Sequence, residues 1–172
     1  METAIVSLIC IALIVFGGMT MSQGFLTSVD STTAGLEEMS GRDEAIMRTE
    51  LATVDATLIS ATNLQVTLEN SGQTKLASFD KWDVIVQYYA DGGAYQVRWL
   101  PYTEGELGVN EWNCEGIYLG GAAEAFEPGI VNPGEEVVIE AYLVPPVGDN
   151  TTNLAVISTP NGIPSSIPFF SP

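Results

Sequence analysis

The chain contains no histidine among its 172 residues. Histidine is the most common general base, the usual partner of the nucleophile in a catalytic triad, and the most common ligand of borderline metals. The sequence also contains no recognisable nucleophile motif. A hydrolase or sugar-processing enzyme would need a nucleophile with its base or a pair of carboxylates in a cleft. We therefore expect a protein that is not an enzyme and has no catalytic residues, no resident metal and no cofactor.

Basic residues are scarce as well. Five Lys and Arg stand against 22 Asp and Glu, which gives a formal net charge of -17. Such a charge makes contact with nucleic acid phosphates or anionic headgroups unfavourable over most of the surface, so we expect no nucleic acid partner. An acidic coat that keeps many identical subunits soluble and an ordinary solvated acidic surface both agree with this composition.

Cysteine is limited to two residues, Cys10 and Cys114. Cys10 lies inside an apolar run and Cys114 in the distal part of the chain, so a disulfide would have to join regions that we expect to be far apart. We expect both thiols to be free, with pairing of Cys114 between subunits as the alternative.

The N-terminal stretch Ala4–Met21 contains no charged residue. Glu2, just ahead of it, is the only ionised side chain before Asp30. These 18 uncharged, mostly apolar residues are just long enough to cross a bilayer as a helix. A cleavable secretory signal would begin with a basic region, which is missing here. We expect either a mature chain from which a basic leader was removed ahead of Met1, which we favour, or an ordinary membrane anchor.

A helical pattern continues beyond this stretch. Apolar residues recur at spacings of three, four and seven, which is typical of one stripe on an α-helix. They are Phe25, Val29, Leu36, Met39, Ile46, Leu51, Val54 and Leu58. We predict one helix over residues 1–55, about 75 Å long and too long for one bilayer. A membrane helix followed by a coiled-coil stalk is the alternative.

Gly17 and Gly18 interrupt the apolar half of this helix. Glycine destabilises a helix interior, so its presence favours either close approach of a second helix or a kink. We predict that the helix is an assembly element that packs among copies of itself. The predicted filament-core residues are Met1, Glu2, Ile5, Leu8, Ile11, Leu13, Val15, Phe16, Gly17, Gly18, Phe25, Val29, Leu36 and Met39.

The pattern changes to β-strands at about residue 56. Seven short β-rich runs are separated by turn signals such as Asn132-Pro133-Gly134 and Asn161-Gly162. The runs cover residues 57–70, 81–90, 94–100, 115–120, 135–144, 153–159 and 163–170. We therefore predict an α+β protein in which a long N-terminal α-helix precedes an antiparallel immunoglobulin-like β-sandwich over residues 56–172. Alternation predicts a core containing Trp82, Val84, Val86, Tyr88, Val137, Ile139, Ala141 and Leu143.

Three groups of residues in the distal part have functional as well as structural interpretations. The acidic residues Glu104, Glu106, Glu111 and Glu115 could bind Ca²⁺, although their spacing matches no EF-hand and a solvated loop is favoured. The aromatic residues Trp99, Tyr102 and Trp112 are expected in the core or at its rim, with a subunit contact or a sugar platform as the alternative. Asn150-Thr151-Thr152 is an acceptor sequence for N-glycosylation in a polar turn.

Most of the chain resembles the archaellin family and its β-sandwich relatives among the archaellum accessory proteins. The resemblance rests on the apolar start METAIVSLICIALIVFGG and on the phrases ENSGQTKL, NPGEEV and STPNG. It implies processing by a pilin-type signal peptidase, passage through a membrane assembly platform with its ATPase, and a helical polymer. Type IV pilins usually carry Glu at the fifth mature position, whereas this chain has Ile5, so Glu2 either pairs with a neighbour's amine or stays hydrated.

The sequence therefore predicts a structural subunit of an extracellular archaellum-like or type IV pilus-like filament. Its partner would be itself, and before assembly it would be held in the cytoplasmic membrane. Motility and adhesion are both open roles for such a filament. The alternative is a membrane-anchored accessory or stator protein whose β-sandwich binds the envelope or surface layer.

Overall fold

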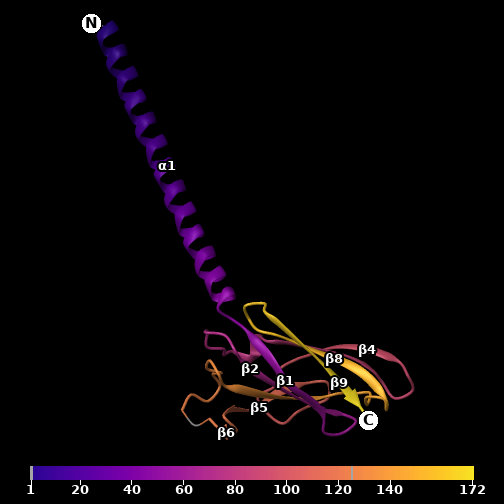
Figure 1. The fold of residues 1–172 in the computed structure, drawn as a ribbon. Coiled ribbons are helices and arrows are strands. Elements are labelled where there is room, and N and C mark those ends of the chain that lie inside the picture. Colours follow the sequence, from indigo (N-terminus) through magenta and orange to yellow (C-terminus); the bar gives the residue numbers. More distant parts are fainter. Residues whose placement is uncertain (1, 125) are drawn as a thin grey trace. The chain divides into compact units, whose positions relative to one another are not determined.

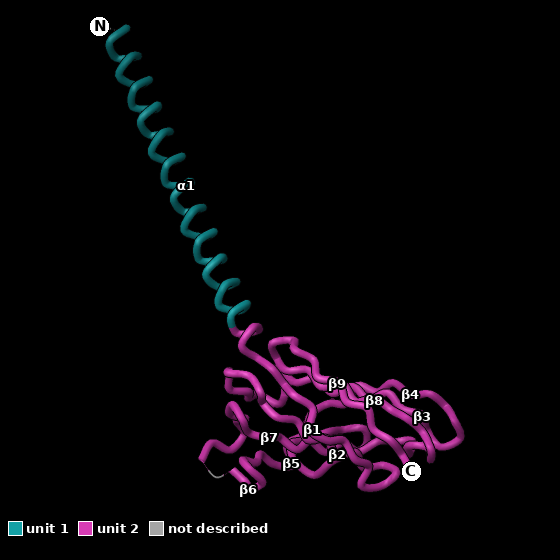
Figure 2. The backbone as a smooth tube through the Cα atoms, viewed as in Figure 1, with its two compact units in different colours: residues 1–44 teal, residues 45–172 magenta. Residues whose placement is uncertain are grey.

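The computed structural model describes residues 2–124 and 126–172, so the predicted assembly residue Met1 and the side chain of Glu2 lie outside what is described. The chain forms two compact units, Met1–Glu44 and Ala45–Pro172, coloured separately in Figure 2. The first unit is helical, and the second contains all the strands (Figure 1). The predicted fold class, a long helix followed by an antiparallel β-sandwich, is confirmed.

The helix α1 spans Glu2–Met47 and has 46 residues. It is therefore about 69 Å long at 1.5 Å per residue. Hydroxyl side chains along it bond back to carbonyls one turn earlier, as Ser7 does to Thr3 and Thr32 to Ser28. These bonds let polar residues sit in a largely apolar helix without an unpaired hydroxyl.

The helix is shorter than the predicted 1–55, because its C-terminal end is held by the rest of the chain. The main-chain carbonyl of Arg48 accepts from the amide of Gln73, and that of Glu50 accepts from Gly72. These bonds replace the helical pattern with a strand, β1, that spans Leu51–Leu58. The apolar residues at 51, 54 and 58 had matched a helical period, but they belong to this strand.

In the part of the chain that the structure describes, the second unit, hereafter the head, contains nine strands and one 3-10 turn after the last residues of α1. Their bounds are β1 Leu51–Leu58, β2 Asn63–Asn70, η1 Phe79–Lys81, β3 Asp83–Tyr89, β4 Tyr95–Leu100, β5 Trp112–Leu119, β6 Ala122–Ala123, β7 Glu136–Tyr142, β8 Thr151–Ser158 and β9 Pro164–Ser171. Every strand pairing within the two sheets is antiparallel.

The strands form two sheets, ordered β1-β2-β7-β5-β6 and β4-β3-β8-β9. Figure 2 shows β3, β4, β8 and β9 together in one layer and β2, β5 and β7 in the other. This order is that of an immunoglobulin sandwich. Its strands A, B, E and D correspond to β1, β2, β7 and β5, and its strands C, F and G correspond to β3, β8 and β9. The strand β4 extends the second sheet beside β3.

The prediction of one strand over residues 57–70 is wrong, because this range contains the end of β1 and the whole of β2. The region is a hairpin, in which β1 and β2 pair from Leu51 with Asn70 to Leu58 with Leu64. The register shifts between Thr53 and Asp55. This irregularity breaks the period of two in β1, which is why alternation did not reveal the strand. The other six predicted runs correspond to β3, β4, β5, β7, β8 and β9.

The core lies between the two sheets, and the predicted core residues are all in it. Trp82, Val84, Val86 and Tyr88, together with Val137, Ile139, Ala141 and Leu143, are each no more than 2 % exposed. Every buried hydrophobic side chain that the structure describes lies between Leu51 and Phe169. The head therefore has a complete core without any contribution from α1, and we expect it to fold by itself.

Asn70 joins two loops at one end of the core, the loop that follows β2 and the loop that precedes β7. It is fully buried, and its amide nitrogen donates to the carbonyls of Thr74 at 2.8 Å and Val131 at 2.9 Å. Its side-chain oxygen accepts from the amide of Gly72 at 3.2 Å. The loop after β2 also runs close to the main chain that follows α1. A Cβ atom on Gly72 would lie 2.6 Å from the carbonyl oxygen of Arg48, so only glycine fits at this position.

Substitution Asn70→Ala should lower the free energy of unfolding of the head by about 2–4 kcal/mol, because it removes three side-chain hydrogen bonds and leaves a cavity at a fully buried position. The control is Gln65→Ala on the same strand, whose side chain bonds only to the exposed Glu115 and should matter little. Denaturant unfolding of residues 45–172 measures both. Equal stability of the two variants would contradict the role given to Asn70.

Candidate assembly surfaces

The helix α1 carries its apolar side chains on the outside on every face. Among the predicted filament-core residues, the large hydrophobic ones from Ile5 to Met39 are exposed by 43 % to 70 %. They are Ile5, Leu8, Ile11, Leu13, Val15, Phe16, Phe25, Val29, Leu36 and Met39. No described part of the chain covers them. An isolated helix of this kind is stable only when lipid or other protein surrounds it.

The glycines of the helix are not explained by contacts within the chain. A Cβ built on Gly17 or Gly18 would meet nothing within 4 Å among the described atoms. Each glycine nevertheless costs helix stability, roughly 0.5–1 kcal/mol relative to alanine. Their place on an exposed apolar helix fits close approach by a second helix.

The same helix has the length and composition of a membrane span. Among the described residues, one helix, Thr3–Met47, is long and apolar enough to cross a membrane, and none of its most apolar window is buried. A helix with these properties occurs both as a membrane span and as a signal sequence near an N-terminus.

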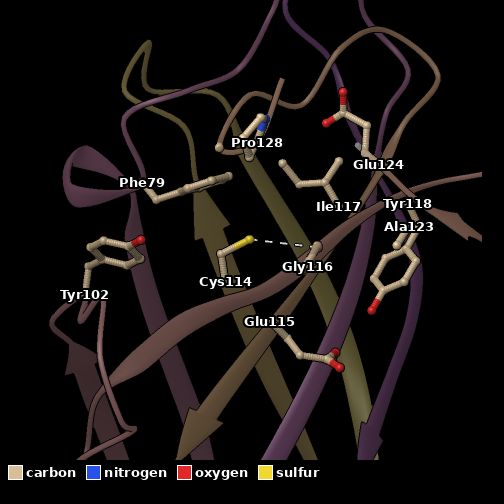
Figure 3. Close-up of a pocket in the computed structure, with 11 residues that line it drawn as sticks. Phe79, Tyr102, Cys114, Glu115, Gly116, Ile117, Tyr118, Ala123, Glu124 and Pro128 are labelled. Atoms are coloured by element: carbon tan, nitrogen blue, oxygen red, sulfur yellow. Dashed lines mark hydrogen bonds between the residues drawn. The ribbon is translucent and has the colours of Figure 1, made fainter. Parts of the chain in front are cut away.

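On the head, a pocket of about 370 Å³ opens beside β5. Figure 3 shows Phe79 and Tyr102 on one side of it and Tyr118 on the other, with Cys114 pointing inward. The ring of Tyr102 packs against that of the buried Trp112, with the ring centroids 4.9 Å apart and the ring planes tilted by 57°. Burial raises the pKa of Tyr102, and the negative charges near it add to the effect. The described lining combines three aromatic residues, Phe79, Tyr102 and Tyr118, with the carboxylates of Glu115 and Glu124.

Among the described residues that line this pocket, Cys114 carries the one thiol. Its sulfur lies 3.8 Å from the main-chain oxygen of Gly116 (Figure 3). Burial raises the pKa of Cys114 to about 11. The thiol is therefore protonated at neutral pH and a poor nucleophile. Cys10 and Cys114 are both free cysteines in the structure, as expected from the sequence.

The acidic residues proposed for calcium do not form one site. Glu111 accepts from the amide of Gly108 at 3.1 Å, and Glu115 accepts from the side chain of Gln65 at 3.2 Å. In the part of the chain that the structure describes, no group of three or more His, Cys, Asp and Glu could hold a metal ion. These glutamates instead stabilise a loop and a sheet surface.

Two further predicted residues are found on the surface. Asn150 is exposed in the turn before β8, with a φ of 55°, so the acceptor sequence is accessible. Trp99 is 59 % exposed on β4, whereas Trp112 is fully buried and Tyr102 lies partly buried against the core. The expected core or rim position therefore holds for Trp112 and Tyr102 but not for Trp99, because β4 is an edge strand whose alternate residues face outward.

Known structures define the class of protein with this architecture. No protein-family model and no curated protein sequence matches the chain. The archaellum periplasmic stator protein FlaG of Sulfolobus acidocaldarius is 24 % identical, with a TM-score of 0.52 over 70 % of this chain and 99 % of that one. A chain in the stator complex of FlaF and FlaG from the same organism is 25 % identical, with a TM-score of 0.53 over 70 % of this chain and 89 % of that one.

A filament shares the fold as well. The archaeal flagellum of Methanospirillum hungatei strain JF1 matches with a TM-score of 0.52 at 9 % identity, over 94 % of this chain and 90 % of that one. A match of this extent includes most of α1 together with the head. The chain thus has an archaellum-related fold, and the resemblance seen in the sequence is confirmed.

The buried thiol makes a prediction about reactivity. At pH 8 iodoacetamide should alkylate Cys114 on the order of 100-fold more slowly in the folded head than in denaturant, because only the thiolate reacts. The pH profile should have its midpoint near 11 rather than 9.0. Since the fold disfavours the thiolate, stability should fall as the pH rises through this range. Mass spectrometry of a Cys10→Ser chain isolates the signal, and equal rates with and without denaturant would refute the burial.

Proposed function

We propose that this chain is the structural subunit of an archaellum-like extracellular filament, and that it polymerises through α1. The observation that carries the proposal is the length of exposed apolar surface on the helix. The hydrocarbon core of a bilayer, about 30 Å thick, takes roughly 20 helical residues. Exposed apolar side chains continue beyond that length, at Phe25, Leu26, Val29, Leu36 and Met39.

The energetics of such an assembly follow from the composition of the helix. Lipid is already apolar, so moving the first part of α1 from membrane to bundle gains packing and close contact at small residues rather than hydrophobic free energy. The later part carries Glu37, Glu38 and Asp43 among its apolar residues, so it faces water before assembly. Covering that apolar stripe with neighbouring helices adds hydrophobic free energy.

The partners follow from this route. The chain would wait in the cytoplasmic membrane, be cut by a pilin-type signal peptidase, and be added to the filament by a membrane platform and its ATPase. The filament would lie outside the cell and serve motility or adhesion. Other copies of the chain would be its main partners.

A second candidate function is that of a membrane-anchored stator. Its support is the similarity to chains from stator structures, which are 24 % to 25 % identical over 70 % of this chain and 89 % to 99 % of their own length. In that role α1 would hold the chain in the membrane, and the sandwich would bind an envelope component.

The two functions differ in whether the helix residues after Met21 must be apolar. Leu36→Glu should abolish filaments, because a carboxylate at a 61 % exposed position would be buried in the helix bundle without a partner. Ala34→Glu serves as the control, because position 34 lies about 200° around the helix from Leu36, on the side of the acidic residues Glu37 and Glu38. Electron microscopy of surface filaments from cells that express each variant measures the effect.

A membrane anchor needs no apolar side chain at position 36, so the stator function predicts that Leu36→Glu leaves localisation and function intact. Normal filaments from the Leu36→Glu chain would contradict assembly through this part of α1.

We also propose that Asn150 is glycosylated once the head is outside the cell. Its exposed place in a polar turn supports the proposal. The head from the native source should lose mass on Asn150→Gln by the mass of one glycan, seen by mass spectrometry, with Asn161→Gln as a control outside any acceptor sequence. An unchanged glycan mass would refute modification at this site.

A further inference from the structure

The outer surface of the four-stranded sheet is apolar across all its strands. Cross-strand pairing places its outward residues in rows, such as Val97, Gln87, Leu154 and Pro168. The complete set is Tyr95, Val97 and Trp99 on β4, Asp83, Ile85, Gln87 and Tyr89 on β3, Thr152, Leu154, Val156 and Ser158 on β8, and Pro164, Ser166, Pro168 and Phe170 on β9. We call this set the apolar face. Of its residues, all within the described range, Asp83 alone carries a formal charge.

The polar groups of the apolar face bond to one another. The indole nitrogen of Trp99 donates to Asp83 at 2.9 Å, and the hydroxyl of Tyr95 donates to the side-chain oxygen of Gln87 at 2.9 Å. The rings of Tyr89 and Tyr95 lie 5.1 Å apart. Because these groups already have partners, covering the face with protein leaves few of them unsatisfied.

The opposite sheet has the reverse character. Its outward positions include Glu69, Glu115, Glu136 and Glu140, and Glu69 lies directly across from Glu136. Two heads with the charge of this chain would repel each other over such a surface. The apolar face is where two copies can approach with little electrostatic cost.

The size of the apolar face is that of a modest interface. Tyr89, Tyr95, Trp99 and Phe170 are exposed by 44 % to 59 %, and Val97 by 58 %. Aromatic side chains cover roughly 150–250 Å² each when fully buried, so these five residues alone offer roughly 500 Å². The prolines and half-buried aliphatic residues bring the face toward the roughly 600–800 Å² per partner of weak to standard interfaces, above the usual single exposed patch.

We propose that the apolar face binds the same face of a second copy of this chain. A symmetric pair of these faces would bury Tyr and Trp side chains, which commonly supply most of the binding free energy at interfaces. The acidic sheets of both copies would remain in water. The contact lies entirely within the head, so it does not depend on assembly through α1.

Sedimentation equilibrium of residues 45–172 tests the pairing, since this unit contains the whole core. The head should dimerise at concentrations of roughly 10–100 µM and more tightly at higher salt, because salt screens the repulsion between two acidic chains.

Val97→Glu should weaken the dimer at least about 10-fold, since it places two carboxylates in the contact. Thr67→Glu adds the same charge on the other sheet and should leave dimerisation unchanged. Circular dichroism confirms that each variant is folded.

In the full-length chain held in membrane, Gln87→Cys in a Cys10→Ser background should form cross-linked dimers with a short bis-maleimide, and Thr67→Cys should not. A head that stays monomeric, equal weakening by both glutamate variants, or equal cross-linking at both positions would overturn the proposal. Binding of the wild-type head to lipid vesicles, lost in Val97→Glu, would assign the face to a membrane instead. None of these outcomes bears on whether α1 forms filaments.

Discussion

The helix α1 cannot bury its apolar surface within its own chain, and the behaviour of the protein depends on that constraint. The helix has 46 residues, and its large hydrophobic side chains remain exposed along most of them. Water is an unfavourable solvent for such a surface, so lipid or other copies of the helix must cover it. Its first part has the length and composition of a membrane span, while the acidic residues from Asp30 onward make the rest amphipathic.

The head meets the opposite requirement. It contains a complete core between two sheets, and Asn70 ties its loops together at one end. Its two outer surfaces differ sharply in charge: one carries four outward glutamates and the other has Asp83 as its single charge among the described strand positions. A head of this kind can stand in water on its acidic side while its apolar side contacts protein. An archaellum-related fold combines both units in one chain.

Much of this organisation could be predicted from the sequence, because burial imposes periods on it. The alternation around Val84 and Val137 located the core, and the uncharged run before Met21 located the helix. The end of the helix could not be predicted, since it is set by main-chain bonds to Gly72 and Gln73, residues distant in the sequence. The apolar face was missed because alternation identifies the buried side of each strand separately. It does not show that outward residues of four strands, such as Val97, Leu154 and Pro168, form one surface once the strands pair. Trp99 was accordingly expected in or beside the core.

The central claim is that neighbouring copies of α1 cover one another. Cryo-electron microscopy of the full-length chain after removal from detergent tests it most directly. The account predicts fibres whose centre is a bundle of long helices, with the β-sandwiches on the outside. Discrete particles, or heads that stay attached singly to membrane with no fibres at any protein concentration, would contradict it.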